Sequence, residues 1–208
     1  MKRVIKKLLF NSVLLISVMS VNAQLLQHGL VINGGTGVVT SNIDRSKAKN
    51  QDWGVFEYRF GFSVGYRLRY QITSLKSLHF DLDPHIGQKF LKVKYYKQNK
   101  PNNYDYGYGN HNFASIGGTA NYFLIKNLIV GFGVEPTYYF DFMRRYESYN
   151  KFDIPVVAKI AYNLRFVEIG IAGKYGLTNV LKSDTELYSM TSGKIHDIHL
   201  SLFFPFRR

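Results

Sequence analysis

The most regular feature of the sequence is a strict alternation of apolar and polar side chains, which is clearest in the stretch FEYRFGFSVGYRLRYQ at 56–71. A β-strand places successive side chains on opposite faces, so one face here is apolar or aromatic and the other carries charge or glycine. The same alternation recurs in seven more segments, at 28–40, 78–94, 113–124, 128–141, 152–164, 166–177 and 195–206. Alternation repeated this often predicts an all-β fold.

The connections between these segments also alternate, in length. The first, third, fifth and seventh connections are long and polar, while the three between them are tight. In a closed antiparallel sheet, odd and even connections lie at opposite ends. The pattern therefore predicts an eight-stranded antiparallel up-and-down transmembrane β-barrel, with long loops outside the cell and both termini at the periplasmic end.

The composition of the two faces indicates which one is turned outward. The polar face is rich in glycine and serine, which suits a narrow lumen filled by side chains. The apolar face carries aromatic residues near strand ends, as an aromatic girdle requires; they include Tyr66, Tyr70, Tyr138, Phe140, Phe204 and Phe206. We therefore expect the apolar face to meet lipid, the alternative being a soluble exported β-protein that hides it.

The first residues have the layout of a secretory signal peptide. Four cations precede an apolar run that closes on a small residue, Ala23. We predict a signal peptide at 1–23 and one barrel domain at 24–208, located in the outer membrane of a Gram-negative cell. Without those four cations, 23 Lys and Arg face 14 Asp and Glu, a basic balance that favours anionic envelope surfaces such as lipopolysaccharide over nucleic acid.

Several motifs resemble the outer-membrane β-barrel domain of the PorT-like family of Bacteroidetes. They are the segments at 60–89 and 152–184, GVEPTYYFDF at 133–142 and the terminal FFPF, although Arg207 and Arg208 depart from a terminal Phe. The segment at 152–184 includes KYGLTNV at 174–180. The resemblance spans roughly 56–206. It implies the barrel architecture and no catalytic residue, because the family covers many barrels without an assigned activity.

Charged residues on the polar face predict a mixed-sign network inside the lumen. The motif HFDLDPH at 79–85 places Asp81 and Asp83 opposite arginines of the preceding strand, since charges at low dielectric need partners. Neighbours two apart on a strand are too distant to share a metal easily, so a charge network is favoured over a metal or catalytic site. The predicted network comprises Glu57, Arg59, Arg67, Arg69, Asp81, Asp83, Glu135, Lys159, Glu168 and Lys174.

A second cluster, Asp197, His199 and Ser201, lies on one face of the last strand. Some small outer-membrane barrels that modify lipid use His, Ser and an acid, but residues two apart on a strand cannot pair directly as nucleophile and base. We expect these side chains to fill the lumen and predict no catalytic residue.

The best candidate for binding outside the lumen is the predicted loop NYDYGYGN at 103–110. Tyrosines on a Gly and Asn frame supply contact area and a hydrogen bond at low entropic cost, and nearby lysines add a cationic approach. The candidate binding residues are Lys97, Lys100, Tyr104, Tyr106 and Tyr108. An ordinary surface loop is the alternative.

Together these observations predict a small outer-membrane barrel with a structural or interaction role in envelope integrity, adhesion or an assembly. The expected partners are outer-membrane lipids and lipopolysaccharide, and possible further ones are another envelope protein or a glycan. We expect no enzyme activity, cofactor, metal, transport pore or nucleic-acid partner. The alternatives are a lipid-modifying outer-membrane enzyme and a narrow solute channel.

Overall fold

The computed structural model describes residues 26–43, 53–72, 74–97, 100–141, 150–164, 166–181 and 190–206. The predicted signal peptide lies outside the described residues. The strands are β1 (Leu26–Ile43), β2 (Trp53–Gln71), β3 (Leu78–Lys97), β4 (Lys100–Ile125), β5 (Leu128–Val134), β6 (Thr137–Asp141), β7 (Phe152–Asp153), β8 (Val156–Asn163), β9 (Glu168–Tyr175) and β10 (Met190–Pro205). Within the described residues no helix is long and apolar enough to span a bilayer.

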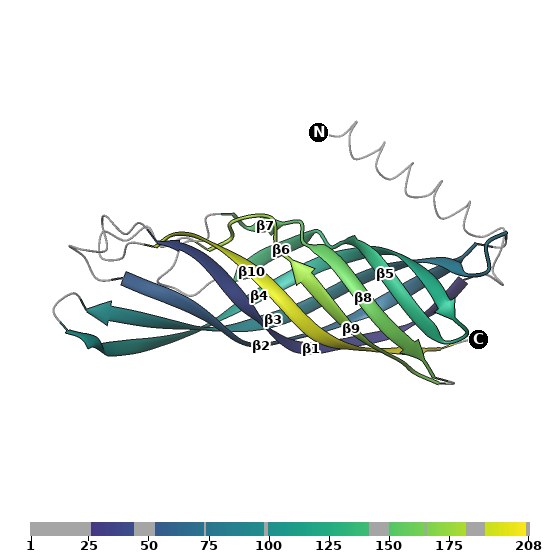
Figure 1. The fold of residues 1–208 in the computed structure, drawn as a ribbon, viewed down its shortest axis with the longest axis horizontal. Coiled ribbons are helices and arrows are strands. Elements are labelled where there is room, and N and C mark those ends of the chain that lie inside the picture. The colour runs from purple at the N-terminus through teal and green to yellow at the C-terminus, as the bar shows by residue number, and fades with distance from the viewer. Residues whose placement is uncertain are drawn as a thin grey trace, which may run out of the picture.

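The strands form one closed antiparallel barrel (Figure 1). The ten strands make eight staves, each stave pairs with the next along the chain, and β1 pairs with β10 to close the ring. Strands β5 and β6 form one stave, because both pair with β4 and are interrupted only at Glu135 and Pro136. Strands β7 and β8 form another, interrupted at Ile154 and Pro155, where proline cannot donate to the ladder. The predicted eight-stranded antiparallel barrel is confirmed.

One end of the barrel has the short connections. Residues 126–127 form a tight turn, and 72–77 and 164–167 join the other strand pairs there. The chain leaves this end too, since the Phe206 amide donates to the carbonyl of His28. The opposite end differs from the prediction at the third connection, because 103–110 is part of β4 and not a loop. Strands β3 and β4 stay paired from Leu78↔Tyr122 to Lys97↔Lys100, so they form one long hairpin.

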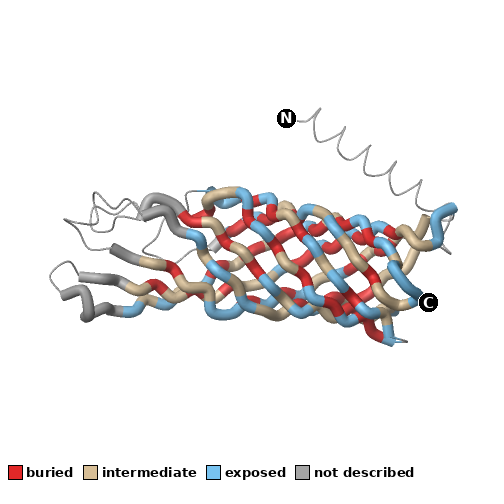
Figure 2. Tube along the Cα trace, viewed as in Figure 1, coloured by how far each residue is buried: buried red, intermediate tan, exposed pale blue. Residues whose placement is uncertain are grey.

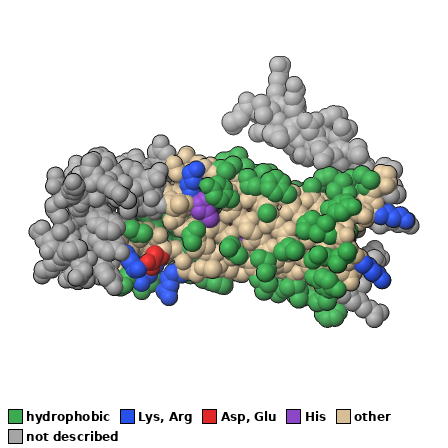
Figure 3. Space-filling view, in the orientation of Figure 1, with side chains coloured by type: hydrophobic (Ala, Val, Ile, Leu, Met, Phe, Trp, Pro, Cys, Tyr) green, Lys and Arg blue, Asp and Glu red, His purple; other side chains and the backbone are tan. Residues whose placement is uncertain are grey.

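Burial alternates along every stave, as Figure 2 shows. Outward side chains are apolar and exposed, for example Phe132, which is 63% exposed, and Ile86, which is 67% exposed. Inward side chains at the same heights are buried and polar, among them Arg67 and Asp81. On the face seen in Figure 3, hydrophobic side chains form patches between the two ends of the barrel, with backbone and small side chains visible between them, and Lys and Arg lie toward the two ends. The arrangement is the inverse of a soluble protein.

A β-bulge at Arg59 reverses the two faces of β2 near its start. Tyr58 pairs with Leu91 and Phe60 with Phe90, which leaves Arg59 as an extra residue. Phe56 is consequently buried inside the barrel, although uninterrupted alternation predicts that it points outward. The same shift makes the prediction wrong for Glu57 and Arg59, which we placed in the lumen network. Arg59 is exposed, and Glu57 forms an outer ion pair with Lys94.

The bulge can be tested by cysteine labelling, because the chain has no native cysteine. In the folded barrel, Glu57→Cys should react readily with a membrane-impermeant maleimide and Phe56→Cys should be protected, since only position 57 points outward. Mass spectrometry of the labelled protein measures both. The reverse reactivity of these two adjacent positions would show that β2 alternates without a bulge.

Candidate functional site: the charged lumen

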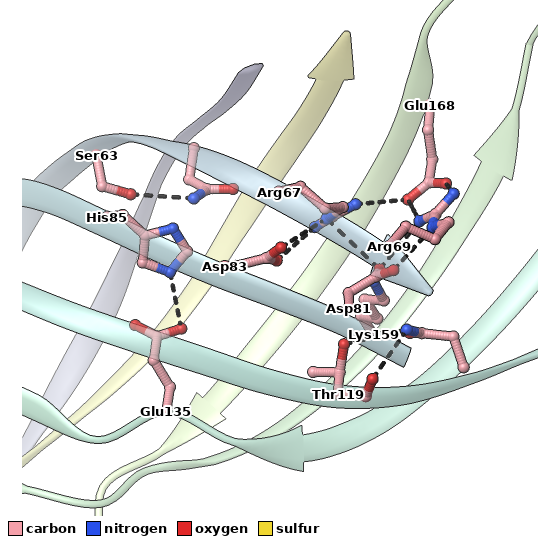
Figure 4. A network of polar contacts seen from close by, with 12 residues as sticks. Ser63, Arg67, Arg69, Asp81, Asp83, His85, Thr119, Glu135, Lys159 and Glu168 are labelled. Atoms are coloured by element: carbon pink, nitrogen blue, oxygen red, sulfur yellow. Dashed lines mark hydrogen bonds and ion pairs between the residues drawn. The ribbon is translucent and has the colours of Figure 1, made fainter. Parts of the chain in front are cut away.

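Two arginines and three carboxylates form the centre of the lumen (Figure 4). Arg67 of β2 donates from Nε and Nη2 to both oxygens of Asp83 on β3, at 2.8 and 2.7 Å. Arg69 grips Asp81 in the same bidentate way, at 2.7 and 3.0 Å. Glu168 of β9 then accepts from both guanidinium groups, at 2.9 Å from Arg67 and 2.7 Å from Arg69. Paired planar contacts of this kind fix geometry as well as charge.

One more cation, Lys159, balances the charge of this central cluster. Lys159 of β8 donates to Asp81 at 2.7 Å, so three cations face three carboxylates in the central cluster. Phe203 of β10 lies beneath the arginines, with its ring centroid 4.9 Å from Cζ of Arg67 and 5.2 Å from that of Arg69. An aromatic face stabilises a guanidinium that has lost its water.

Two further ion pairs lie toward the end with long connections. Lys174 of β9 donates to Glu135 at 2.6 Å, and Nε2 of His85 is 3.4 Å from the same carboxylate. Lys89 of β3 donates to Asp197 of β10 at 2.7 Å and to the Tyr139 hydroxyl at 3.1 Å. Each pair joins strands that are not neighbours in the barrel, so these contacts cross the lumen.

Beyond Lys89 the filling changes from charge to hydrocarbon. A cluster of buried apolar side chains occupies this end of the described barrel, with Val39 and Tyr58 packed against it. Its members are Phe56, Leu91, Val93, Phe113, Tyr139, Val180, Leu181 and Ile195. The ammonium of Lys89 marks the border, because it lies 5.3 Å from the ring centroid of Phe113.

Little free space is left between these side chains. Two lumen cavities, one beside Lys89 and one beside Arg67 and Glu135, have volumes of about 30 Å³ each. That is room for about one water molecule. Small residues make the filling possible, since a Cβ at Gly131 would lie 2.1 Å from Oδ1 of Asn121 and 2.9 Å from Cε of Lys159.

The structure brings together most of the residues predicted for the lumen network. Eight of them meet in the contacts above, and only Glu57 and Arg59 lie on the outer face. The histidines of the motif at 79–85 take part weakly, with His79 Nε2 3.9 Å from Asp81. Among the residues of the described barrel, no group of three or more His, Cys, Asp or Glu could hold a metal ion. Asp197 is bound to Lys89 and not to His199 or Ser201.

Sequence reasoning missed two aromatic parts of the site. Phe203 lies on the same strand face as the predicted lumen residues His199 and Ser201, and Tyr139 on the same face as Thr137, so counting by twos would have found both. Of the predicted binding residues, Tyr106 and Tyr108 lie exposed on β4. The side chains of Lys97, Lys100 and Tyr104 fall outside what the structure describes.

Comparison with known proteins assigns this chain to no family. No family model matches the chain, and no curated protein matches it. Among solved structures, the crystal structure of the outer membrane protein OprG from Pseudomonas aeruginosa is similar, with 10% sequence identity, a TM-score of 0.45, and coverage of 88% of this chain and 95% of that one. The PorT-like resemblance therefore stays a prediction from the motifs that carry it.

Replacing Glu168 by Gln should destabilise the folded barrel strongly. The change leaves three cations in the lumen, Arg67, Arg69 and Lys159, facing two carboxylates, and breaking a buried ion pair costs about 3–5 kcal/mol. Glu57→Gln is the matched control, because that pair lies on the outer surface, with the Glu57 side chain 39% exposed, and such pairs contribute about 0–1 kcal/mol. Urea unfolding in lipid vesicles measures both free energies. Equal values for the two variants would contradict the role of Glu168.

Proposed function

We propose that this protein is an integral outer-membrane barrel with a structural or interaction role and a closed lumen. One observation carries the proposal: the exposed surface of the staves is apolar while the enclosed side is charged and paired. A bilayer is the solvent in which that inversion is favourable, because its hydrocarbon accepts the apolar outer face. A closed sheet also pairs its backbone groups internally, as a membrane-spanning segment requires. The basic composition and the predicted signal peptide support the same location.

The state of the lumen favours this role over transport or catalysis. The carboxylates of Asp81, Asp83, Glu135, Glu168 and Asp197 each accept from a Lys or Arg at 2.6–2.9 Å. A carboxylate held in this way is a poor general base, and the pairs block the axis of the barrel. We therefore propose neither the lipid-modifying enzyme nor the solute channel.

Interaction is assigned to the end with the long connections, where β3 and β4 extend beyond the shorter staves (Figure 1). A transmembrane strand needs about 9–11 residues, and β4 has 26. The surplus lies on the side of the predicted binding residues Lys97, Lys100, Tyr104, Tyr106 and Tyr108. Outer-membrane lipids and lipopolysaccharide are the proposed partners, and an envelope protein or a glycan is a further proposed partner for the same β3–β4 hairpin. The motifs shared with the PorT-like family are compatible with this role.

The location is tested by solubility and fractionation. The mature chain should remain monodisperse only in detergent or lipid, because the apolar band otherwise drives aggregation. In cells it should sediment with the outer-membrane fraction. A protein that stays monodisperse in plain buffer would overturn the proposal.

The closed lumen is tested in planar bilayers. The folded protein should give no conductance steps above background, since the ion pairs leave cavities of only about 30 Å³. Insertion is verified independently by protease protection of the same preparation. Reproducible steps from inserted protein would show that the lumen conducts.

A further inference from the structure

We propose that the outer face of β2, β3 and β4 binds a phosphorylated glycolipid of the outer leaflet, with its phosphate on Arg59 and Lys92 and an acyl chain in the apolar groove below. The inference rests on the proposed location in the outer membrane. It assigns a partner to one face of the barrel, from two features that lie on the same three strands.

The first feature is a group of cations on the outer face, Arg59, Lys92 and Lys94, which we call the cationic step. Register places Glu57, Lys92 and Tyr108 side by side on β2, β3 and β4. The Lys92 ammonium lies 3.4 Å from the ring centroid of Tyr106, and Cζ of Arg59 lies 5.7 Å from that of Tyr108. These rings hold both cations against the sheet, so less side-chain entropy is lost when an anion binds.

The charge at this step is suited to a phosphate. Within the part of this face whose side chains the structure describes, Arg59, Lys92 and Lys94 are accompanied by one carboxylate, Glu57, which pairs with Lys94. Arg59 and Lys92 form none of the ion pairs found among the described side chains. A guanidinium and an ammonium together offer the fork and the point charge that phosphate oxygens prefer.

The second feature is the apolar surface directly below. One step along the same strands, Phe60, Phe62 and Phe90 point outward, and the rings of Phe62 and Phe90 stack with centroids 6.2 Å apart. The change from cations to aromatic rings on adjacent strands is typical of the aromatic girdle at a membrane interface. A phosphate at that interface belongs to a lipid.

An open groove of about 830 Å³ lies farther along the same strands, toward the middle of the membrane. Gln88 and Asn112, which are hydrogen-bonded to each other, lie between these rings and the groove. Outward side chains line it, including Val64, Ile86, Ala114, Ile116 and Tyr138. From Lys92 to Ile86 the strand advances about 20 Å, at roughly 3.3 Å per residue. At the strand tilt of about 40° usual in such barrels, this advance is about 15 Å along the membrane normal. That depth reaches well into the acyl chains, since half the hydrocarbon core is about 15 Å thick.

Headgroup and chain together require an acyl lipid whose phosphate carries no compensating amine charge. A zwitterionic phospholipid brings its own cation to the phosphate, which a cationic step repels. Free phosphate would bind the step and leave the groove empty. A phosphorylated glycolipid of the lipid A type satisfies both features, because it carries phosphate without a compensating amine charge and has several acyl chains.

The experiment uses the full mature barrel in nanodiscs of zwitterionic phospholipid, titrated with bisphosphorylated lipid A and followed by native mass spectrometry. The wild type should retain lipid A, and Arg59→Gln with Lys92→Gln should bind at least about tenfold more weakly, since a cation at a membrane surface contributes about a factor of five. The matched control is Lys76→Gln with Lys126→Gln, which removes the same charge at the other end and should leave affinity within about twofold.

Two further arms separate the parts of the proposal. Ala114→Phe fills the groove with an apolar ring and should weaken lipid A binding while the step is intact. Dephosphorylated lipid A should bind no better to the wild type than to the Arg59 and Lys92 variant. Equal loss in the step variant and the control, or no retention by the inserted wild type, overturns the inference. A chain that fails to enter nanodiscs overturns the proposed location instead.

Discussion

The pairing of buried charges across the lumen is the constraint on which the rest of this structure depends. A barrel of eight staves has an interior just wide enough for side chains. Each charged side chain there loses its hydration and needs an oppositely charged partner in direct contact. Glu168 joins β9 to both arginines of β2, and Lys159 joins β8 to Asp81 on β3. Because these contacts run between opposite walls, they set the separation of the walls, a task that a hydrophobic core performs in a soluble protein.

The same constraint explains why the lumen has two kinds of filling. Ion pairs fill the part surrounded by the exposed apolar band, and apolar side chains fill the part toward the long connections. Lys89 stands between them, bound to Asp197 on one side and enclosed by the rings of Phe113 and Tyr139. The apolar cluster fills this part of the lumen with packed hydrocarbon, and the low dielectric beside Lys89 strengthens its attraction to Asp197.

The alternation of side chains along each strand predicted the strands, the closed barrel and most of the lumen residues, because the side-chain period of a strand is fixed. It failed at Arg59, since a bulge leaves no mark in a run where Phe56, Tyr58 and Phe60 suit lipid and interior equally. It failed again at 103–110, where Gly, Asn and Tyr are typical of loops although cross-strand pairing with 90–96 makes a hairpin. The partners of each charge were not predictable in full, because Glu168 meets Arg67 and Arg69 only after the ring closes.

The extra residue at Arg59 links the interior of the barrel to its outer surface. By reversing the faces of β2, it turns Phe56 and Tyr58 inward, where they join the apolar closure, and it turns Glu57 outward beside Lys92. The side chain of Arg59 itself then lies at the border between exposed aromatic rings and cations. Without the bulge, an acid would enter the apolar cluster, and the outer face would lose a cation at the height where headgroups begin. A single backbone irregularity thus determines both what closes the lumen and what the membrane surface meets.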